Sequence, residues 1–179
     1  MAQPVTLNPL LCVHCGTPLP AQPGELVWAC TQCQQGQMIF KGEELVPIEI
    51  NYHSGISAGA TGRPYWVANG TVHMNRQTYS GSDLKEAQRF WSTARMFFIP
   101  AYNCTLERLV ELGPRMLQQP VALQAGPIAS FEPVTVVQDD IYGLAEFIVM
   151  GIEASRKDKL KELTFQLELG LPALWILPG

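Results

Sequence analysis

Four cysteines near the amino terminus carry the clearest chemical signal in the chain. They form two Cys-x-x-Cys pairs, Cys12 with Cys15 and Cys30 with Cys33, and fourteen residues separate the pairs. Two residues between cysteines let a tight turn direct both sulfur atoms at one ion, and two such pairs supply the four thiolates of a structural zinc site. We therefore predict that these four residues hold one Zn²⁺. Such a site is closed, so it stabilises a fold and does no chemistry of its own.

The segment 10–41 is organised around these pairs. Its apolar stretches at 26–29 and 37–40 predict two strands, and Gly16 and Gly36 suit backbone with positive φ. This segment resembles the zinc-ribbon family, and the resemblance carries over the four cysteines as ligands and nothing else. Because the segment has few apolar residues, the metal is expected to supply most of its folding free energy, roughly 10 kcal/mol or more.

An iron site for electron transfer is the alternative for the same cysteines. Two Cys-x-x-Cys pairs can hold a single iron, although the separation between the pairs is short for proteins of that kind. Zinc is the favoured ion, and the colour and metal content of the protein distinguish the two.

The composition indicates a protein that covers apolar surface with a partner. Of the 179 residues, 47% are hydrophobic and 16% are charged, which is below the usual charged share of about 25%. Such a surface favours a protein partner or a homo-oligomer. The formal net charge is −4 and the pI is about 5.3, so the chain has no global attraction for phosphate backbones.

The expected location is the cytoplasm. No run of about 18 apolar residues is present, so no membrane-spanning helix is expected. The first residues lack the charged and apolar regions of a secretory signal. Thiolate ligands also require a reducing compartment.

The chain after the ribbon predicts an α+β body, with a mainly antiparallel sheet and about three helices packed on it. We expect residues 1–41 to form the zinc ribbon and residues 42–179 to form the body. Alternating or apolar stretches predict strands at 46–52, 65–68, 71–74, 96–99, 134–137, 163–169 and 173–177. Asn69-Gly70 predicts a two-residue hairpin turn between the second and third of these, and Gly170 predicts a turn that returns the last strand.

Three segments have helical signals. Asp83 begins a capping box, and the helix that follows is expected to end near Thr93. A second helix is expected from Asn103 or Thr105, with a break or kink at Gly113-Pro114. The clearest helical periodicity runs from about residue 140 to residue 156.

The remaining polar residues form no convergent catalytic set, and we identify no catalytic and no cofactor-binding residue. Surface or structural roles are favoured for the histidines, although His53 and His73 can approach each other across strands. Cys104 is interpreted as a packed small residue, and Asp139-Asp140 as a helix cap. A basic cluster is interpreted as the solvated end of the third helix, with docking of an acidic partner as the alternative: Arg156, Lys157, Lys159 and Lys161.

Several aromatic segments extend the resemblance to the whole chain. With the ribbon, the pair Tyr65-Trp66, the segment from Phe97 to Tyr102, the stretch 157–162 and the carboxyl-terminal Trp175 are similar to those of an uncharacterised group of bacterial zinc-ribbon proteins. These motifs are structural in character, and the resemblance implies no established activity.

The preferred hypothesis is a non-enzymatic zinc-binding subunit or adaptor that mediates protein–protein assembly. Residues 1–40 contain no lysine or arginine and one acid, Glu25, whereas each phosphate contact requires a cation. A nucleic-acid-binding ribbon is therefore the alternative, and an enzyme with an unrecognised site is the second. The expected contact surface is the ribbon face around Val13, Trp28 and Phe40, or the aromatic strands.

Overall fold

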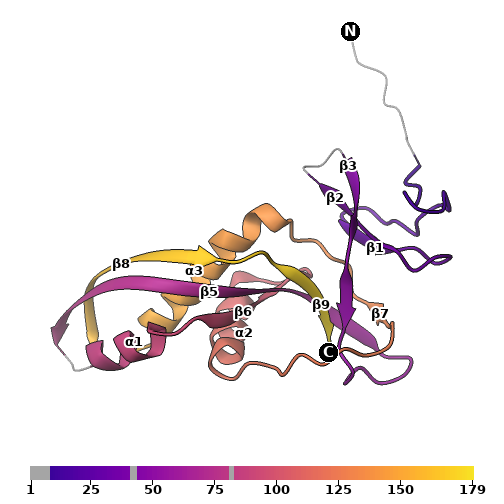
Figure 1. Cartoon of the computed structure of the whole chain (residues 1–179). Coiled ribbons are helices and arrows are strands. Elements are labelled where there is room, and N and C mark those ends of the chain that lie inside the picture. Colours follow the sequence, from indigo (N-terminus) through magenta and orange to yellow (C-terminus); the bar gives the residue numbers. More distant parts are fainter. Residues whose placement is uncertain (1–8, 41–43, 81–82) are drawn as a thin grey trace, which may run out of the picture.

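The computed structural model describes residues 9–40, 44–80 and 83–179, and it contains two sheets and three α-helices (Figure 1). The predicted α+β class with about three helices is confirmed. The strands of the small sheet are β1 (Val27–Ala29), β2 (Gly36–Phe40) and β3 (Glu44–Ile48). The large sheet contains β4 (Ile50–Tyr52), β5 (Thr61–Ser80), β6 (Arg95–Pro100), β8 (Lys159–Leu169) and β9 (Ala173–Leu177), and β7 (Ser130–Phe131) joins the start of β5.

The small sheet is antiparallel with the order β1-β2-β3, so it extends beyond the two predicted ribbon strands. The division of the chain at residues 41 and 42 stays a prediction. The single strand predicted at 46–52 is wrong, because β3 joins the small sheet and β4 joins the large one. The change of sheet occurs where the chain passes close over Gly36. A Cβ atom at Gly36 would lie 2.4 Å from the Ile48 carbonyl oxygen and 2.8 Å from an Ile50 side-chain carbon.

The large sheet is built on β5, a strand of twenty residues. β6 pairs antiparallel with residues 65–70 of β5, β8 with residues 70–80, and β9 with residues 63–67. β7 pairs parallel with Thr61 and Gly62, and β4 pairs parallel with β9. The predicted return of the last strand is therefore wrong, because β8 and β9 pair one after the other with β5 and not with each other.

The hairpin predicted at Asn69-Gly70 is also wrong, since both residues lie inside β5. Gly70 pairs with Arg95 of β6 on one edge and with Leu169 of β8 on the other, at the point where the pairing with β6 ends and β8 takes over from β9. A Cβ atom there would lie 2.8 Å from Phe97 and 3.0 Å from Leu169. The glycine therefore makes room for the junction of three strands, and its φ is not positive.

The three helices are α1 (Leu84–Trp91), α2 (Leu106–Gln118) and α3 (Ile141–Ala154), and Figure 1 shows them along the large sheet. α2 begins where predicted, because the Thr105 hydroxyl accepts a hydrogen bond from the Arg108 N–H at 3.3 Å. Of the break or kink predicted at Gly113-Pro114, the break is wrong, since α2 continues past Pro114 to Gln118; the kink stays a prediction. The strand predicted at 134–137 is absent, and the N–H groups of Thr135 and Val136 both donate to the Ala101 carbonyl, at 2.7 and 3.2 Å.

Small residues bring α2 and α3 together. Gly113 of α2 is buried against Ile148 of α3, and a Cβ atom at Gly113 would lie 2.4 Å from an Ile148 carbon. On the other helix, Gly151 lies against Val110, with 3.0 Å from its built Cβ to a Val110 methyl group. The packing of α3 on α2 therefore explains the Gly-Pro pair inside a helix.

One hydrophobic cluster joins the small sheet to the body. Val27 of β1 and Met38 of β2 belong to the same buried cluster as Trp66 of β5, Ile99 of β6 and Ile148 of α3. The other face of the large sheet packs a second cluster around Tyr65, Val67 and Phe98. The ribbon thus folds back on the body through one face of its sheet.

We expect Gly113→Ala to destabilise the protein and Gly143→Ala to stabilise it. The added methyl group at Gly113 collides with Ile148, so overpacking should cost about 1–3 kcal/mol. Gly143 in α3 has no atom within 4 Å of a built Cβ, so alanine should add roughly 0.4–1 kcal/mol by restricting the unfolded chain. Urea unfolding of both variants measures the difference, and equal stabilities would contradict this account of the α2–α3 contact.

Candidate metal centre

The structure brings the four predicted cysteines together. Their sulfur atoms all lie within 4.8 Å of one another, and the Cys12–Cys33 and Cys15–Cys30 Sγ pairs are each separated by 3.5 Å. These separations are too long for disulfides, whose sulfur atoms lie about 2.05 Å apart. They are close to the ~3.8 Å expected between ligands of a tetrahedral ion with Zn–S bonds of ~2.3 Å. The donor set therefore fits one tetrahedral metal ion.

Two turns position the sulfur atoms. In the first, the Gly16 N–H donates to the Cys12 carbonyl at 2.8 Å, and Gly16 has the expected positive φ of 71°. In the second, the Gln34 N–H donates to the Cys30 carbonyl at 2.9 Å, and Gln34 has a φ of 63°. The expectation of positive φ at Gly36 is wrong, because that residue already belongs to β2.

The thiols influence one another's ionisation. Although burial raises the pKa of Cys12, backbone N–H groups of Cys15 and His14 that donate to its sulfur lower this pKa to about 6. The Gln35 N–H lowers the pKa of Cys33, but burial and the three neighbouring thiols raise it to about 12. One sulfur is therefore disposed to be a thiolate while another resists ionisation. A divalent cation among them removes this conflict, since it favours the charged form of all four.

A buried amide lies beside the site. The Gln37 side chain is fully buried on β2, and its Oε1 accepts a hydrogen bond from the Val13 N–H at 2.8 Å. Its Nε2 has no hydrogen-bond partner among the described residues. An N–H group inside the ribbon is suited to the field of anionic thiolates, because groups around a metal site orient and stabilise its ligands. Sequence reasoning missed Gln37. The sequence shows only a polar residue inside a predicted strand, and the pairing of β2 with β1 is what places its side chain on the buried face.

The histidines do not form a site together. His14 is exposed in the first turn. His53 Nδ1 accepts from the Gly55 N–H at 2.9 Å, so its Nε2 donates to the Ala122 carbonyl at 2.9 Å and ties two loops together. His73 lies on β5, with its Nε2 4.0 Å from Glu168 on β8.

The environments of Cys104, Asp83 and Asp140 indicate structural roles and not catalytic ones. Cys104 packs with the second hydrophobic cluster, where burial raises the pKa of its thiol, so the start of α2 does not activate it. Asp140 and Asp83 precede α3 and α1, but neither side chain makes a capping hydrogen bond. The Asp83 carboxylate instead accepts from the Lys157 N–H at 3.2 Å.

A buried network of charges, which sequence reasoning missed, lies at the far end of β5. The Arg76 guanidinium contacts both carboxylate oxygens of Asp158, and its Nε lies 2.8 Å from Glu153 Oε2. Glu153 Oε1 accepts from Trp91 Nε1 at 2.8 Å and from Arg156 Nε at 2.9 Å. Each carboxylate oxygen of Glu153 and Asp158 thus lies beside a cationic or N–H group, although the Arg76 Nε–Glu153 Oε2 contact is an ion pair without hydrogen-bond geometry. This arrangement favours a structural role over catalysis. This network also corrects the predicted basic cluster. Arg156 is tied to Glu153, and two of the lysines lie on β8.

The comparisons with known proteins are negative. No family model, no curated protein and no solved structure matches the chain, so the resemblance to a bacterial group stays a prediction. None of the helices in the described part of the chain is long and apolar enough to span a membrane.

We expect Asp158 to stabilise the protein in a pH-dependent way. The Arg76 guanidinium, which donates to its carboxylate, lowers the pKa of Asp158 below its ordinary value of 3.8. This stabilisation is complete above the ordinary value and is lost as the pH falls through the lower pKa of the folded state. Urea unfolding between about pH 5 and pH 2 should therefore give a shallower loss of stability for Asp158→Asn than for the native protein.

Asp140→Asn is the matched control for this measurement, because it removes an exposed carboxylate outside the network. All three proteins keep the four cysteines, so any loss of metal at low pH is common to them. If Asp158→Asn lost stability with falling pH as steeply as the native protein, the pH-dependent stabilisation assigned to Asp158 would be contradicted.

Proposed function

We propose that the chain is a non-enzymatic zinc-binding subunit that mediates protein–protein assembly, with one structural Zn²⁺ held by Cys12, Cys15, Cys30 and Cys33. The observation that carries the metal assignment is the convergence of four sulfur atoms to within 4.8 Å of one another. Four cysteine ligands fill a tetrahedral site and leave no open position for a substrate. A structural role therefore fits this donor set better than a catalytic one.

The metal would stabilise the ribbon, which has a small core of its own. The cluster on the metal side of the small sheet contains Leu19 and Trp28 with the buried Cys12 and Cys30. So little apolar surface cannot hold a sheet without additional stabilisation. The metal would keep β1 and β2 in the register that presents Val27 and Met38 to the body.

Exposed apolar side chains on the ribbon support a protein partner. Leu11 and Val13 beside the first turn are 44% and 53% exposed, and Phe40 at the end of β2 is 38% exposed. Trp28 does not belong to this surface, because it is 4% exposed and its Nε1 donates to Glu25 at 2.8 Å. The expected contact face therefore excludes Trp28 and keeps Leu11, Val13 and Phe40.

The charge of the ribbon opposes the alternative of nucleic-acid binding. Residues 1–40 supply no lysine or arginine, and a Zn²⁺ with four thiolates would add a formal charge of −2. Both features disfavour contact with phosphates. No convergent catalytic set among the described residues supports an enzymatic function, so it stays the less favoured alternative.

We expect the purified protein to contain about one zinc per chain, and Cys30→Ser to lose it. Cys104→Ser is the control, because Cys104 lies away from the cluster of four sulfur atoms and should leave the zinc content unchanged. Elemental analysis measures both, and iron in place of zinc would support the electron-transfer alternative. Full zinc occupancy in Cys30→Ser would refute the assignment.

We also expect no binding of nucleic acid below about 10 μM in gel-shift titrations at low salt with single- and double-stranded DNA and RNA.

Co-purification from cells should recover a protein partner, and Val13→Glu should reduce its recovery while His14→Gln, a neutral change in the same turn, should not. Tight and salt-sensitive binding of nucleic acid would overturn the adaptor proposal in favour of the alternative.

A further inference from the structure

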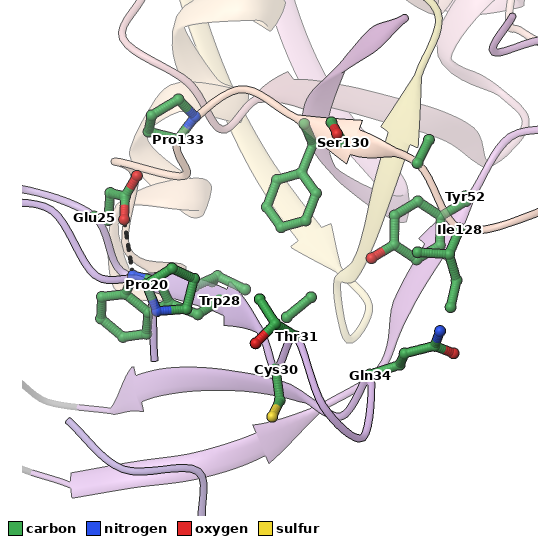
Figure 2. A pocket seen from close by; sticks show the side chains of 14 residues that line it. Pro20, Glu25, Trp28, Cys30, Thr31, Gln34, Tyr52, Ile128, Ser130 and Pro133 are labelled. Atoms are coloured by element: carbon green, nitrogen blue, oxygen red, sulfur yellow. Dashed lines mark hydrogen bonds between the residues drawn. The ribbon is translucent and has the colours of Figure 1, made fainter. Parts of the chain in front are cut away.

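A groove separates the ribbon from the body. It has a volume of about 540 Å³ and lies between β1 and the segment 128–133 that contains β7 (Figure 2). This volume is within the range of about 300–1,000 Å³ that is typical of ligand pockets. We call it the edge groove, because a strand forms each of its two sides.

The edge of β1 that faces the groove has open backbone groups. The Ile39 N–H donates to the Leu26 carbonyl at 2.9 Å, and the Cys30 N–H donates to the Gln35 carbonyl at 3.0 Å. Alternate residues of an antiparallel strand face the same neighbour, so Trp28 also faces β2 while Val27 and Ala29 face the other way. Both of these residues line the groove, and neither has a backbone partner on that side among the described residues.

The edge of β7 on the opposite side of the groove also has unpaired backbone groups. The Glu132 N–H donates to the Gly62 carbonyl at 2.9 Å, in a parallel ladder that pairs Gly62 with Phe131. In such a ladder the residues on either side of Phe131 face β5, so the N–H and carbonyl of Phe131 point away from it. The ring of Phe131 lies 6.3 Å from that of Tyr52, centroid to centroid. Both residues line the groove, as does Ile128, which is 53% exposed.

The two edges meet at one end. The Leu26 N–H, just before β1, donates to the Val134 carbonyl at 2.9 Å and ties the two edges together there. Beyond this bond the edges separate and enclose the groove. An extended peptide inserted there can supply the hydrogen bonds that β1 and β7 lack toward each other, which is recognition by strand addition.

The charge of the groove selects the kind of peptide. Glu25 is the one charged residue among the fourteen that line it, and Figure 2 shows it with Trp28 and Pro133 at one end. Its Oε2 accepts from Trp28 Nε1 at 2.8 Å and from the Gln22 N–H at 2.9 Å, so the carboxylate is held in place. No described hydrogen bond occupies Oε1. With the negative charge of a metal-loaded four-cysteine site beside Cys30, this end is complementary to a cation.

We propose that the edge groove binds an extended segment of a partner protein, which adds a strand between β1 and β7. One lysine or arginine of this segment pairs with Glu25, and an apolar side chain packs on Tyr52, Ile128 and Phe131 at the other end. The inference deepens the proposed function and rests on it, since it adds a second binding site to the contact face at the first turn and names the class of partner segment for the assembly role.

The test uses the zinc-loaded full-length protein and a displayed library of random heptapeptides. We expect enrichment of peptides with β-branched or aromatic residues at alternate positions and at least one lysine or arginine. For a labelled enriched peptide, fluorescence anisotropy should show Kd raised at least about tenfold by Ile128→Arg, which places a charged side chain where the apolar residue of the peptide packs, and about threefold or more by Glu25→Gln. Glutamine can still accept from Trp28 Nε1, so the ribbon should keep its structure. Leu171→Arg is the control, because Leu171 is 97% exposed in the turn before β9 and should leave Kd unchanged.

A second measurement changes the peptide and leaves the protein intact. N-methylation of either set of alternate amides should weaken binding, because one set faces β1 and the other faces β7 when the peptide lies between the two edges. Tolerance of both sets would contradict backbone pairing. Failure to enrich any peptide, or binding that Ile128→Arg does not weaken, would overturn the inference. With one zinc per chain and a recovered partner, that failure would leave the proposed function standing. Loss of the metal assignment or tight binding of nucleic acid would instead remove the proposed function itself.

Discussion

The pairing of β6, β7, β8 and β9 with the long strand β5 is the constraint on which the rest of the structure depends. β5 has four direct partners, and the first half of the strand is covered on both edges by β6 and β9. Its second half pairs with β8 and packs on α1. A two-stranded ribbon is marginally stable by itself. The buried contact of Arg76 with Glu153 and Asp158 ties this far half to the end of α3 and to the turn before β8, which explains why charges are buried there.

The ribbon depends on two stabilising effects that act on opposite faces of one small sheet. On one face Cys12, Leu19, Trp28 and Cys30 form a small buried cluster, where a bound metal would supply the stabilisation that hydrophobic burial cannot. On the other face Val27 and Met38 join the main core. Because successive residues of a strand point to opposite sides, loss of the metal would also loosen the register that places these two residues in the body. The metal centre and the core are thus coupled through three short strands.

Features that depend on residues close together in the sequence could be predicted, and features that depend on distant residues could not. The cysteine spacing identified the four clustered sulfur atoms, and helical periodicity identified α3, because both depend on neighbours along the chain. Asn69-Gly70 misled for the same reason. The local turn preference lost to the pairing of β5 with β6 and then β8, which residues far away in the sequence determine. Gly113-Pro114 stayed helical because tertiary packing, including that of Gly113 against Ile148, outweighs a local cost of roughly 4 kcal/mol for glycine and proline inside a helix. Arg76 appears in the sequence as an ordinary strand residue, and only the approach of Asp158 makes it a core residue.

The protection of the strand edges differs across the molecule, and β1 is among the least protected strands. β4 also lacks a charge and a proline, but its Tyr52 carbonyl accepts from the Gly126 N–H at 2.7 Å. Exposed strand edges invite pairing with other chains, and proteins discourage it with charges and proline. The outer edge of β3 carries Glu44 and Pro47, β6 ends in Pro100, and β8 carries Lys159, Lys161 and Glu162. β1 consists of valine, tryptophan and alanine, without a charge or a proline. An edge that lacks these protections must be covered by its own chain or used for pairing. The single bond from Leu26 to Val134 covers it at one end, and the groove leaves the remainder available for an added strand.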